Sequence, residues 1–401
     1  MPLALGTTRP AEPHADAKAR IAGAVEAARD EIIALSHRIH SNPEPAFEEH
    51  EAARLVAESL RRHGYAVEHP AGRLATAIRA TRAGGRGGAK PRIGILAEYD
   101  ALPGLGHGCG HNTMAASGVG AAIALAALAD ELPGETVFFG TPAEERGSGK
   151  QIMIDDGLFA GIDAALLYHP CDRDHVESHP LASEDVDVVF TGLQAHAAAD
   201  PWKGRNALDA MILLFSSVGL WRQQLRPDSR VHGIIQEGGT AANIIPERTK
   251  AWFMLRSPDQ AYYEEIKQRF RALAEAAAQA TDTSVEVTFS GGARSMHQNR
   301  TLEARWVENA AAYGIVDQGP DPNSGSTDMA NVSWICPTIH PELSIAETGT
   351  PGHSIRFRDA AVSARADDTT LLAAMLVAQT AYELFADPVL VEAAWREFRE
   401  R

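Results

Sequence analysis

The spacing of apolar residues near the start of the chain predicts two helices. From Ile21 to His40, isoleucine and leucine recur close to helical spacing, and Asn42-Pro43 ends the pattern. A second helix is predicted from about Glu48 to His63, and the glycine that follows is a stop signal. Both helices precede the first strands of the chain.

Alternating strands and helices dominate the next part of the chain. The segments "YAVEH", "ATAIRA" and "RIGILAEYD" are predicted strands, and the apolar run "GILAEYD" is typical of a central, fully buried strand. The strands "ETVFFGTPAEE" and "DAALLYHP" follow, each after a predicted helix. This alternation indicates an α/β fold with a mostly parallel central sheet, in which ligands bind beyond the carboxyl ends of the strands.

The pattern changes after about Ser183. The segments "EDVDVVFTGLQAHAA" and "TKAWFMLRS" alternate apolar and polar residues, as antiparallel strands with one open face do. Two predicted helices, about Asn206 to Arg222 and Asp259 to Ala280, lie among strands of this kind. We therefore expect a catalytic domain made of residues 1–183 and 294–401, with a small α+β domain inserted at residues 184–293.

Composition narrows the possible partners and location. The 401 residues, 45% of them hydrophobic, can bury a sizeable core, and the formal charge of −16 argues against nucleic acid or an anionic membrane as a partner. Three cysteines form no disulfide framework and suit a reducing compartment. The chain start has no secretory-signal pattern, and the run from Val119 to Ala129 is too short to span a bilayer. We expect a cytoplasmic protein.

Candidate metal ligands cluster at the predicted strand ends. The nine residues "GLGHGCGHN", from Gly104 to Asn112, suit neither a core strand nor a helix, but their glycines allow the backbone to bring a thiol and an imidazole together. Thiolate, imidazole and carboxylate are ligands that zinc or manganese takes. The candidate donors are Cys109, His111, Glu145, His169 and, far downstream, His353.

Five donors exceed the need of one tetrahedral ion. We therefore expect two divalent ions, zinc or manganese, roughly 3.5–4 Å apart around a shared water. The two carboxylates of "TPAEE" can have different roles. Glu145 can bind metal, while Glu144 takes a proton from that water and passes it to the leaving amine. Each residue alone has a simpler structural explanation, and the prediction depends on their combination at successive strand ends.

Competing motifs fit the sequence less well. The segment "EERGSGKQ" ends like a phosphate-binding loop, but Glu144 and Gln151 stand where the motif needs glycine and a hydroxyl residue. The chain contains no Gly-x-Ser-x-Gly elbow of a serine hydrolase. A cysteine-nucleophile mechanism at Cys109 stays open, although His111 is too close in sequence to be the usual base.

Taken together, the motifs resemble those of the dinuclear metallopeptidase family that includes aminoacylases, glutamate carboxypeptidases and auxin-conjugate amidohydrolases. The nearest branch contains aminobenzoyl-glutamate hydrolases and β-alanyl-dipeptide dipeptidases. The family's auxin-conjugate members usually carry Asp after the second histidine of the first motif, whereas this chain has Asn112, in agreement with that branch. The matching pieces span about Arg38 to Ser354: "RIHSNPE", "AEYDALPGLGHGCGHN", "GTPAEE", "HP" at His169, "GLQAHAA", "PWKGRNALDA", "GGTAANIIPE", "SGSTDMANVS" and "GHS".

The resemblance implies specific roles. It supports the five metal ligands and Glu144 as the general base, and implies that Asp100 orients a ligand. It implies a homodimer through the inserted domain, in which His196 reaches the partner's active site and stabilises the oxyanion. It also implies that Asn243 and Arg256 bind a substrate carboxylate, although Arg256 could instead form a salt bridge on a strand.

The sequence thus predicts a two-metal amidohydrolase. Its substrate is a small amide: an N-acyl or aminoacyl amino acid with a free carboxylate, of the aminobenzoyl-glutamate kind. Three alternatives stay open: a dipeptidase for β-alanyl or basic dipeptides, a non-catalytic metal-bound binding module, and a structural subunit of a hetero-oligomer.

Overall fold

Three helices begin the described part of the chain. The computed structural model describes residues 14–320 and 325–401, so the chain start that lacks a signal pattern lies outside it. Helices α1 (Ala15–Ala27) and α2 (Arg29–Ser41) are separate because the backbone at Ala28 leaves helical geometry. The single first helix predicted from the sequence is therefore wrong. Helix α3 (His50–Arg62) lies where the second was expected.

A six-stranded sheet forms the centre of the larger domain. Its strand order is β1-β2-β4-β3-β5-β11, with β4, β3, β5 and β11 parallel and β2 antiparallel to both of its neighbours, β1 and β4. Every residue of β3 and β4 after the first is buried, as expected for strands covered on both faces. The strands are β1 (Ala66–Glu68), β2 (Ile78–Ala83), β3 (Arg92–Glu98), β4 (Glu135–Thr141), β5 (Ala164–Leu166) and β11 (Thr338–Ile339).

Two long helices, α4 (His111–Ala127) and α11 (Ala364–Ala386), pack against each other beside this sheet. Among the described helices, α11 alone is long and apolar enough by composition to cross a membrane, and 72% of its apolar window is buried in the structure. Its apolar surface is therefore covered by the rest of the domain. The remaining elements are η1 (Ala129–Glu131), α5 (Gly149–Asp155), β6 (His169–Cys171), α8 (Arg300–Ala311), α9 (Met329–Val332), β12 (Glu342–Ser344), α10 (Ile355–Ala360) and α12 (Pro388–Arg399).

The short strand β6 differs from expectation. The sequence pattern predicts one strand running through "DAALLYHP", but β5 ends at Leu166 and His169 begins a new strand. This strand pairs in parallel with β12 in a separate two-stranded sheet. His169 therefore lies just beyond the carboxyl end of β5, and the loop between the strands sets its position.

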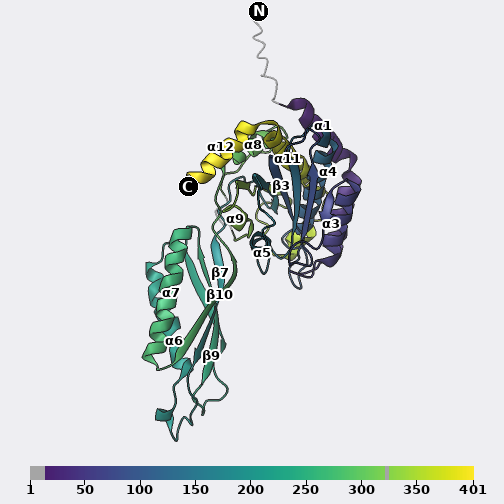
Figure 1. The fold of residues 1–401 in the computed structure, drawn as a ribbon. Helices are drawn as coiled ribbons and strands as arrows, with labels where there is room; N and C mark the ends of the chain where they lie inside the picture. The colour runs from purple at the N-terminus through teal and green to yellow at the C-terminus, as the bar shows by residue number, and fades with distance from the viewer. Residues whose placement is uncertain (1–13, 321–324) are drawn as a thin grey trace, which may run out of the picture.

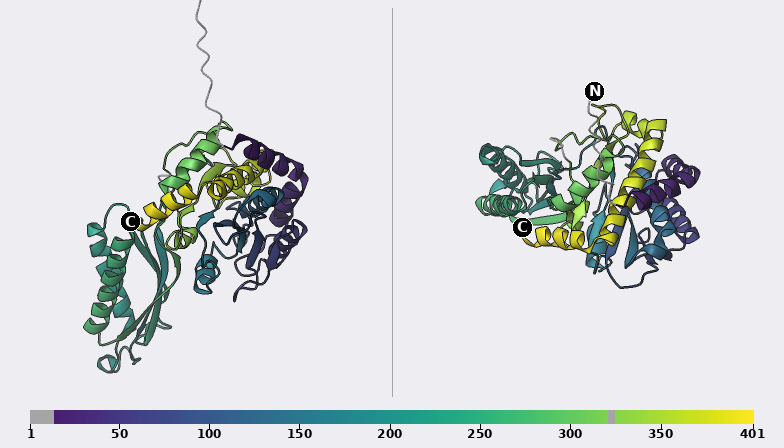
Figure 2. Two further views of the ribbon diagram at one scale, coloured as in Figure 1. Left: turned by 45° about the horizontal axis from the view of Figure 1, so that its top comes forward. Right: turned by 90° about the horizontal axis from the view of Figure 1, so that it is seen from above.

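A second sheet, β10-β7-β9-β8, is entirely antiparallel and has its own hydrophobic core. Helices α6 (Ala207–Trp221) and α7 (Gln260–Ala280) cover one face of it, and the whole unit projects away from the larger domain (Figures 1 and 2). We call this unit the lid. Its other elements are β7 (Ala182–Thr191), η2 (Pro201–Lys203), η3 (Arg222–Gln224), β8 (Arg230–Glu237), β9 (Arg248–Ser257) and β10 (Ser284–Ala293).

Candidate metal centre

A cavity of about 570 Å³ lies where the lid meets the larger domain. Its wall from the lid includes Met254 and Arg256 of β9. The opposite wall comes from the loops after β3 and β4, from β6 and from the loop before α10, and it carries Cys109, Glu144, Glu145, His169 and His353. The structure thus places four of the five predicted donors on the wall of one cavity. The fifth, His111, lies behind this wall, close to Cys109.

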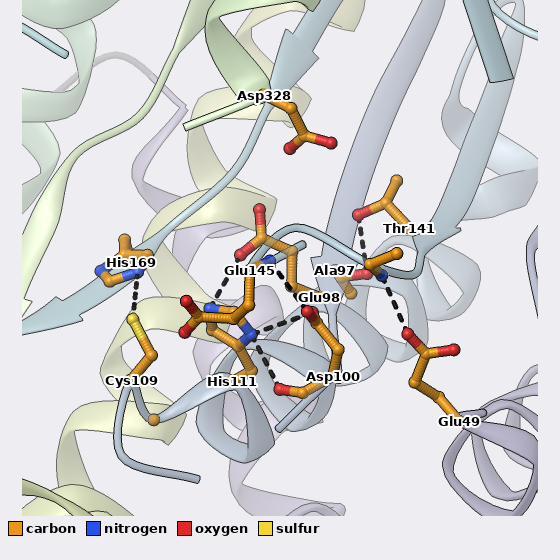
Figure 3. A network of polar contacts seen from close by, with 12 residues as sticks. Glu49, Ala97, Glu98, Asp100, Cys109, His111, Thr141, Glu145, His169 and Asp328 are labelled. Atoms are coloured by element: carbon orange, nitrogen blue, oxygen red, sulfur yellow. Dashed lines mark hydrogen bonds and ion pairs between the residues drawn. The ribbon is translucent and has the colours of Figure 1, made fainter. Parts of the chain in front are cut away.

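Cys109 and His169 face each other across 3.6 Å from Sγ to Nε2 (Figure 3). His169 Nδ1 donates to the carbonyl of Pro170 at 2.8 Å, so Nε2 is the nitrogen with a free lone pair. Burial lowers the pKa of His169 to about 4, which keeps the ring neutral at pH 7. Gly110 permits this approach, because its φ is +78° and a Cβ there would lie 2.7 Å from Pro170 Cγ.

Asp100 fixes the orientation of His111. Its Oδ1 lies 3.1 Å from His111 Nδ1, its backbone carbonyl lies 3.0 Å from the same nitrogen, and its Oδ2 accepts the Glu145 N–H at 2.9 Å. Two acceptors at Nδ1 place the proton there and leave Nε2 free to bind a cation. One buried carboxylate therefore holds both a candidate imidazole ligand and the backbone of a candidate carboxylate ligand.

The loop after β4 presents Glu144 and Glu145. Ala143 has a φ of +60°, and its N–H donates at 2.9 Å to the buried carboxylate of Glu49, which fixes this unusual turn. Burial raises the pKa of Glu144, and the charges of Glu98 and Glu145 raise it further. Glu145 Oε1 lies 3.5 Å from His353 Nε2. The side chain of His353 is 57% exposed, so this donor comes from the open side of the cavity.

Sequence reasoning missed a buried ion-pair network beside these donors. Lys150 Nζ contacts Glu98 Oε1 at 2.6 Å and Asp328 Oδ1 at 2.5 Å, and all three side chains are at most 2% exposed. Lys150 lies in the segment "EERGSGKQ", whose local pattern is that of a glycine-containing loop and does not indicate that the lysine is buried. Burial alone would lower the pKa of Lys150, but the carboxylates of Asp328 and Glu98 more than offset this and raise it.

The side chains present fit divalent cations. Within each of two groups the donor atoms lie within 4.8 Å of one another: Cys109 with His111 and His169, and Cys109 with Glu145 and His353. His111 Nε2 and Glu145 Oε1 are buried without a hydrogen-bond partner in the described chain, as expected of atoms that bind a cation. Because the two groups share only Cys109, their side chains would hold two divalent ions, which would supply Lewis acidity at the cavity wall.

Other predicted residues are divided between the cavity and the lid surface. Arg256 lines the cavity, and its buried Nε has no partner among the described residues. His196 and Asn243 do not line the cavity of their own chain. His196 instead forms a β-bridge with Ile244, and its neighbour Ala197 donates to the Asn243 carbonyl at 3.0 Å.

Asn112 points away from the donors. Its side-chain amide donates to Ser36 and to the carbonyl of Ala361, and these bonds hold α4 in place.

A family model described as peptidase family M20/M25/M40 matches residues 94–382. The chain belongs to this family. The Xaa-Arg dipeptidase of Homo sapiens is 35% identical over 404 residues, which cover 95% of this chain and 92% of that protein. A p-aminobenzoyl-glutamate hydrolase chain of Escherichia coli is 29% identical over 454 residues, 94% of each chain. A dinuclear metal-binding M20 peptidase of Bacillus subtilis has a TM-score of 0.70 at 22% identity, covering 90% of this chain and 99% of that structure.

Membership of the M20/M25/M40 family confirms the resemblance and the fold class predicted from the sequence. The protein is a metallo-amidohydrolase or peptidase, as the family and the hydrolytic relatives show. The non-catalytic binding module is therefore disfavoured. The predicted roles of the individual site residues stay predictions, and so does the choice between zinc and manganese.

Proposed function

We propose that the protein is a metal-dependent dipeptidase that releases a C-terminal amino acid with a basic side chain. The observation that supports hydrolysis is the position of Glu144 on the cavity wall, directly beside the candidate metal donors. A base in that position is needed for amide hydrolysis and has no use in a protein that only binds metal.

The charge of the cavity wall supports a basic substrate. Besides Glu144, Glu145 and Asp328, which is paired with Lys150, four carboxylates line it, against two arginines, Arg146 and Arg256. Glu184 is paired with Lys267 at 2.5 Å and Asp172 with Arg173 at 3.6 Å, and the other two are Asp185 and Glu342. Such a wall attracts a cationic side chain. The similarity to Xaa-Arg dipeptidase supports the same class of substrate.

Arg256 is the proposed anchor for the substrate's terminal carboxylate. Its guanidinium offers a planar pair of donors that matches a carboxylate, and among the described residues it donates only a weak hydrogen bond, to Met254 Sδ at 3.8 Å. The acidic wall alone would also attract a free amine or a metal ion. A carboxylate anchor opposite the metal donors therefore favours an amino acid as the leaving group.

The chain's own groups account for the proton transfers. Divalent cations at these donors supply Lewis acidity, which polarises the scissile carbonyl and acidifies a water molecule. Glu144 accepts a proton from that water on its carboxylate and later delivers it to the departing nitrogen. Its raised pKa suits this exchange, because the carboxyl group must both take up and release the proton. Arg256 holds the leaving amino acid in place meanwhile.

A panel of amides tests this proposal. The purified chain, with manganese or zinc, is given alanyl-arginine, β-alanyl-lysine, alanyl-leucine and aminobenzoyl-glutamate, and hydrolysis is followed by mass spectrometry with and without chelator. We expect chelator-sensitive cleavage, with kcat/KM at least about ten-fold higher for basic dipeptides than for alanyl-leucine, or roughly 1.4 kcal/mol. Faster cleavage of aminobenzoyl-glutamate would overturn the basic specificity, and no cleavage by metal-loaded protein would overturn the dipeptidase assignment.

We also propose that the active form is a homodimer through the lid. Support comes from β8, which pairs with a neighbour on one side only, and from apolar side chains exposed on and near it, Ile234, Ile235 and Trp252. The absence of His196 and Asn243 from the cavity of their own chain fits a role in the partner's cavity.

A further inference from the structure

Glu98 is the last residue of the central strand β3, and its side chain is fully buried beside the candidate metal donors. Its Oε2 lies 3.2 Å from His111 Nε2, the nitrogen that Asp100 leaves free. Yet neither atom has a hydrogen-bond partner in the part of the chain that the structure describes, because the approach lacks hydrogen-bond geometry. Two buried acceptor atoms thus face each other at short range.

Such a pair needs a positive charge between its members. With one proton of His111 on Nδ1, Nε2 and Oε2 are buried together at a cost unless a second proton or a metal cation lies between them, and a metal that displaces such a proton can bind both atoms. Donors about 2.1 Å from a shared ion lie within about 4.2 Å of each other, so 3.2 Å is compatible with one. One ligand atom from each of Glu98, His111 and Glu144 lies within 4.8 Å of the others, so the proposed base Glu144 stands beside this cation position.

The other oxygen of Glu98 is fixed. Oε1 is held by Lys150 Nζ at 2.6 Å, and the same ammonium group contacts Asp328 Oδ1 at 2.5 Å. Asp328 in turn accepts the backbone N–H of Lys150 on its Oδ2 at 2.9 Å. Lys150 is fully buried, so the ammonium group cannot rotate to alternative partners in solvent. The network therefore holds the Glu98 carboxylate in a single orientation, with Oε2 directed at His111.

We propose that Glu98 is a sixth metal-facing donor, which Lys150 and Asp328 hold so that its free oxygen shares a cation position with His111. Lys150 is a positioning residue in this arrangement: its charge balances the two carboxylates, and its geometry directs one of them. The inference rests on the proposed function only in placing metal at these side chains, and it adds a carboxylate to the five donors predicted from the sequence.

The test measures metal binding rather than turnover. Chelator-stripped full-length protein is titrated with Mn²⁺ by calorimetry, and the tighter position is resolved by competition with a chelator. We expect two equivalents in the wild type. Glu98→Gln should weaken one of them at least ten-fold, and Lys150→Met should weaken the same one. The matched control is Glu383→Gln, which breaks another buried ion pair, to Lys18 at 2.9 Å, away from the donors. It should bind both ions as the wild type does.

The outcomes separate this inference from the proposed function. Wild-type affinities for both ions in Glu98→Gln would overturn the inference and leave the dipeptidase proposal standing. A wild type that binds no metal would overturn both. If Glu98→Gln does not fold, Glu98→Asp decides. It keeps the charge opposite Lys150 but is shorter by one methylene, so weakened binding at one position supports the inference and wild-type binding overturns it.

Discussion

Replacing Asp100 by asparagine should reverse the protonation of His111 while leaving the fold intact. In the wild type, Asp100 accepts at both oxygens, from His111 Nδ1 and from the Glu145 N–H. An amide has only one acceptor oxygen. If that oxygen keeps the Glu145 N–H, the NH₂ group faces His111 Nδ1, which must then become an acceptor. The ring proton moves to Nε2, which faces Glu98 Oε2 at 3.2 Å.

The expected changes in metal affinity and in the free energy of unfolding follow from the bonds that each atom loses. A protonated Nε2 cannot bind metal, and loss of such an orienting partner typically weakens metal binding 10- to 100-fold, about 1.4–2.7 kcal/mol. The unfolding free energy of the metal-free protein should fall by only about 1 kcal/mol, because one hydrogen bond, from Nδ1 to the Asp100 carbonyl, is lost. Asp100→Asn should therefore separate metal affinity from stability.

Calorimetric metal titration and urea denaturation of the metal-free protein measure the two quantities. The matched control is Asp163→Asn, another buried aspartate, which accepts the Arg92 N–H at 2.7 Å and pairs with Lys90. It should lose stability without losing metal affinity. Wild-type metal affinity in Asp100→Asn would refute the reasoning about the His111 tautomer.

Further variants test the base, the dimer, the specificity and the pH dependence. Glu144→Gln should retain both metals but lose at least about 10²-fold in kcat, and near-normal turnover would contradict its role as base. His196→Ala should be inactive alone yet regain activity when mixed and re-associated with Glu144→Gln, and failure of this complementation would contradict a shared active site. Asp185→Asn should lower kcat/KM about five-fold for alanyl-arginine, which corresponds to about 1 kcal/mol for a partly exposed charge pair, and should leave kcat/KM for alanyl-leucine unchanged. An equal loss of kcat/KM for both substrates would argue against charge recognition. Burial raises the pKa of Glu49 to about 7, so its contribution to stability is complete below pH 4.5 and is lost as the pH rises toward 7, by at most about 3 kcal/mol. Glu49→Gln should remove this part of the pH dependence in denaturation measured from pH 4.5 to 7.5, and an unchanged slope would contradict the assignment.

The sequence predicted well those features that depend on local pattern. Apolar runs identified the buried strands β3 and β4, and alternation identified the open-faced strand β9 of the lid. Residue type and position at strand ends were enough to select the candidate donors, which the structure brings close together around Cys109. Local pattern could not show the break at Ala28 or the new strand at His169, because tertiary packing determines where a periodic segment bends.

The network around Lys150 could not be predicted for a different reason. Asp328 lies 178 residues away along the chain, and no local spacing relates it to Lys150. A lysine in a glycine-containing loop is normally solvent-exposed, and only the folded structure shows that two carboxylates keep it charged inside the protein. Glu98 was visible as a charge at the end of a buried strand, but its direction depends on that distant pair.

The insertion of the lid between β5 and β11 affects the order in which the protein can fold during synthesis. The lid sheet, Ala182–Ala293, leaves the ribosome as one continuous segment with its own core. The larger domain cannot complete its fold at that stage. Strand β5 gains its outer neighbour β11 only when Thr338–Ile339 has been made, and α4 gains its packing partner α11 later still. Until then the apolar edge of the growing sheet is unpaired and prone to aggregation. Nascent chains stalled before residue 338 should therefore contain a folded lid attached to an unfinished catalytic domain that depends on chaperones.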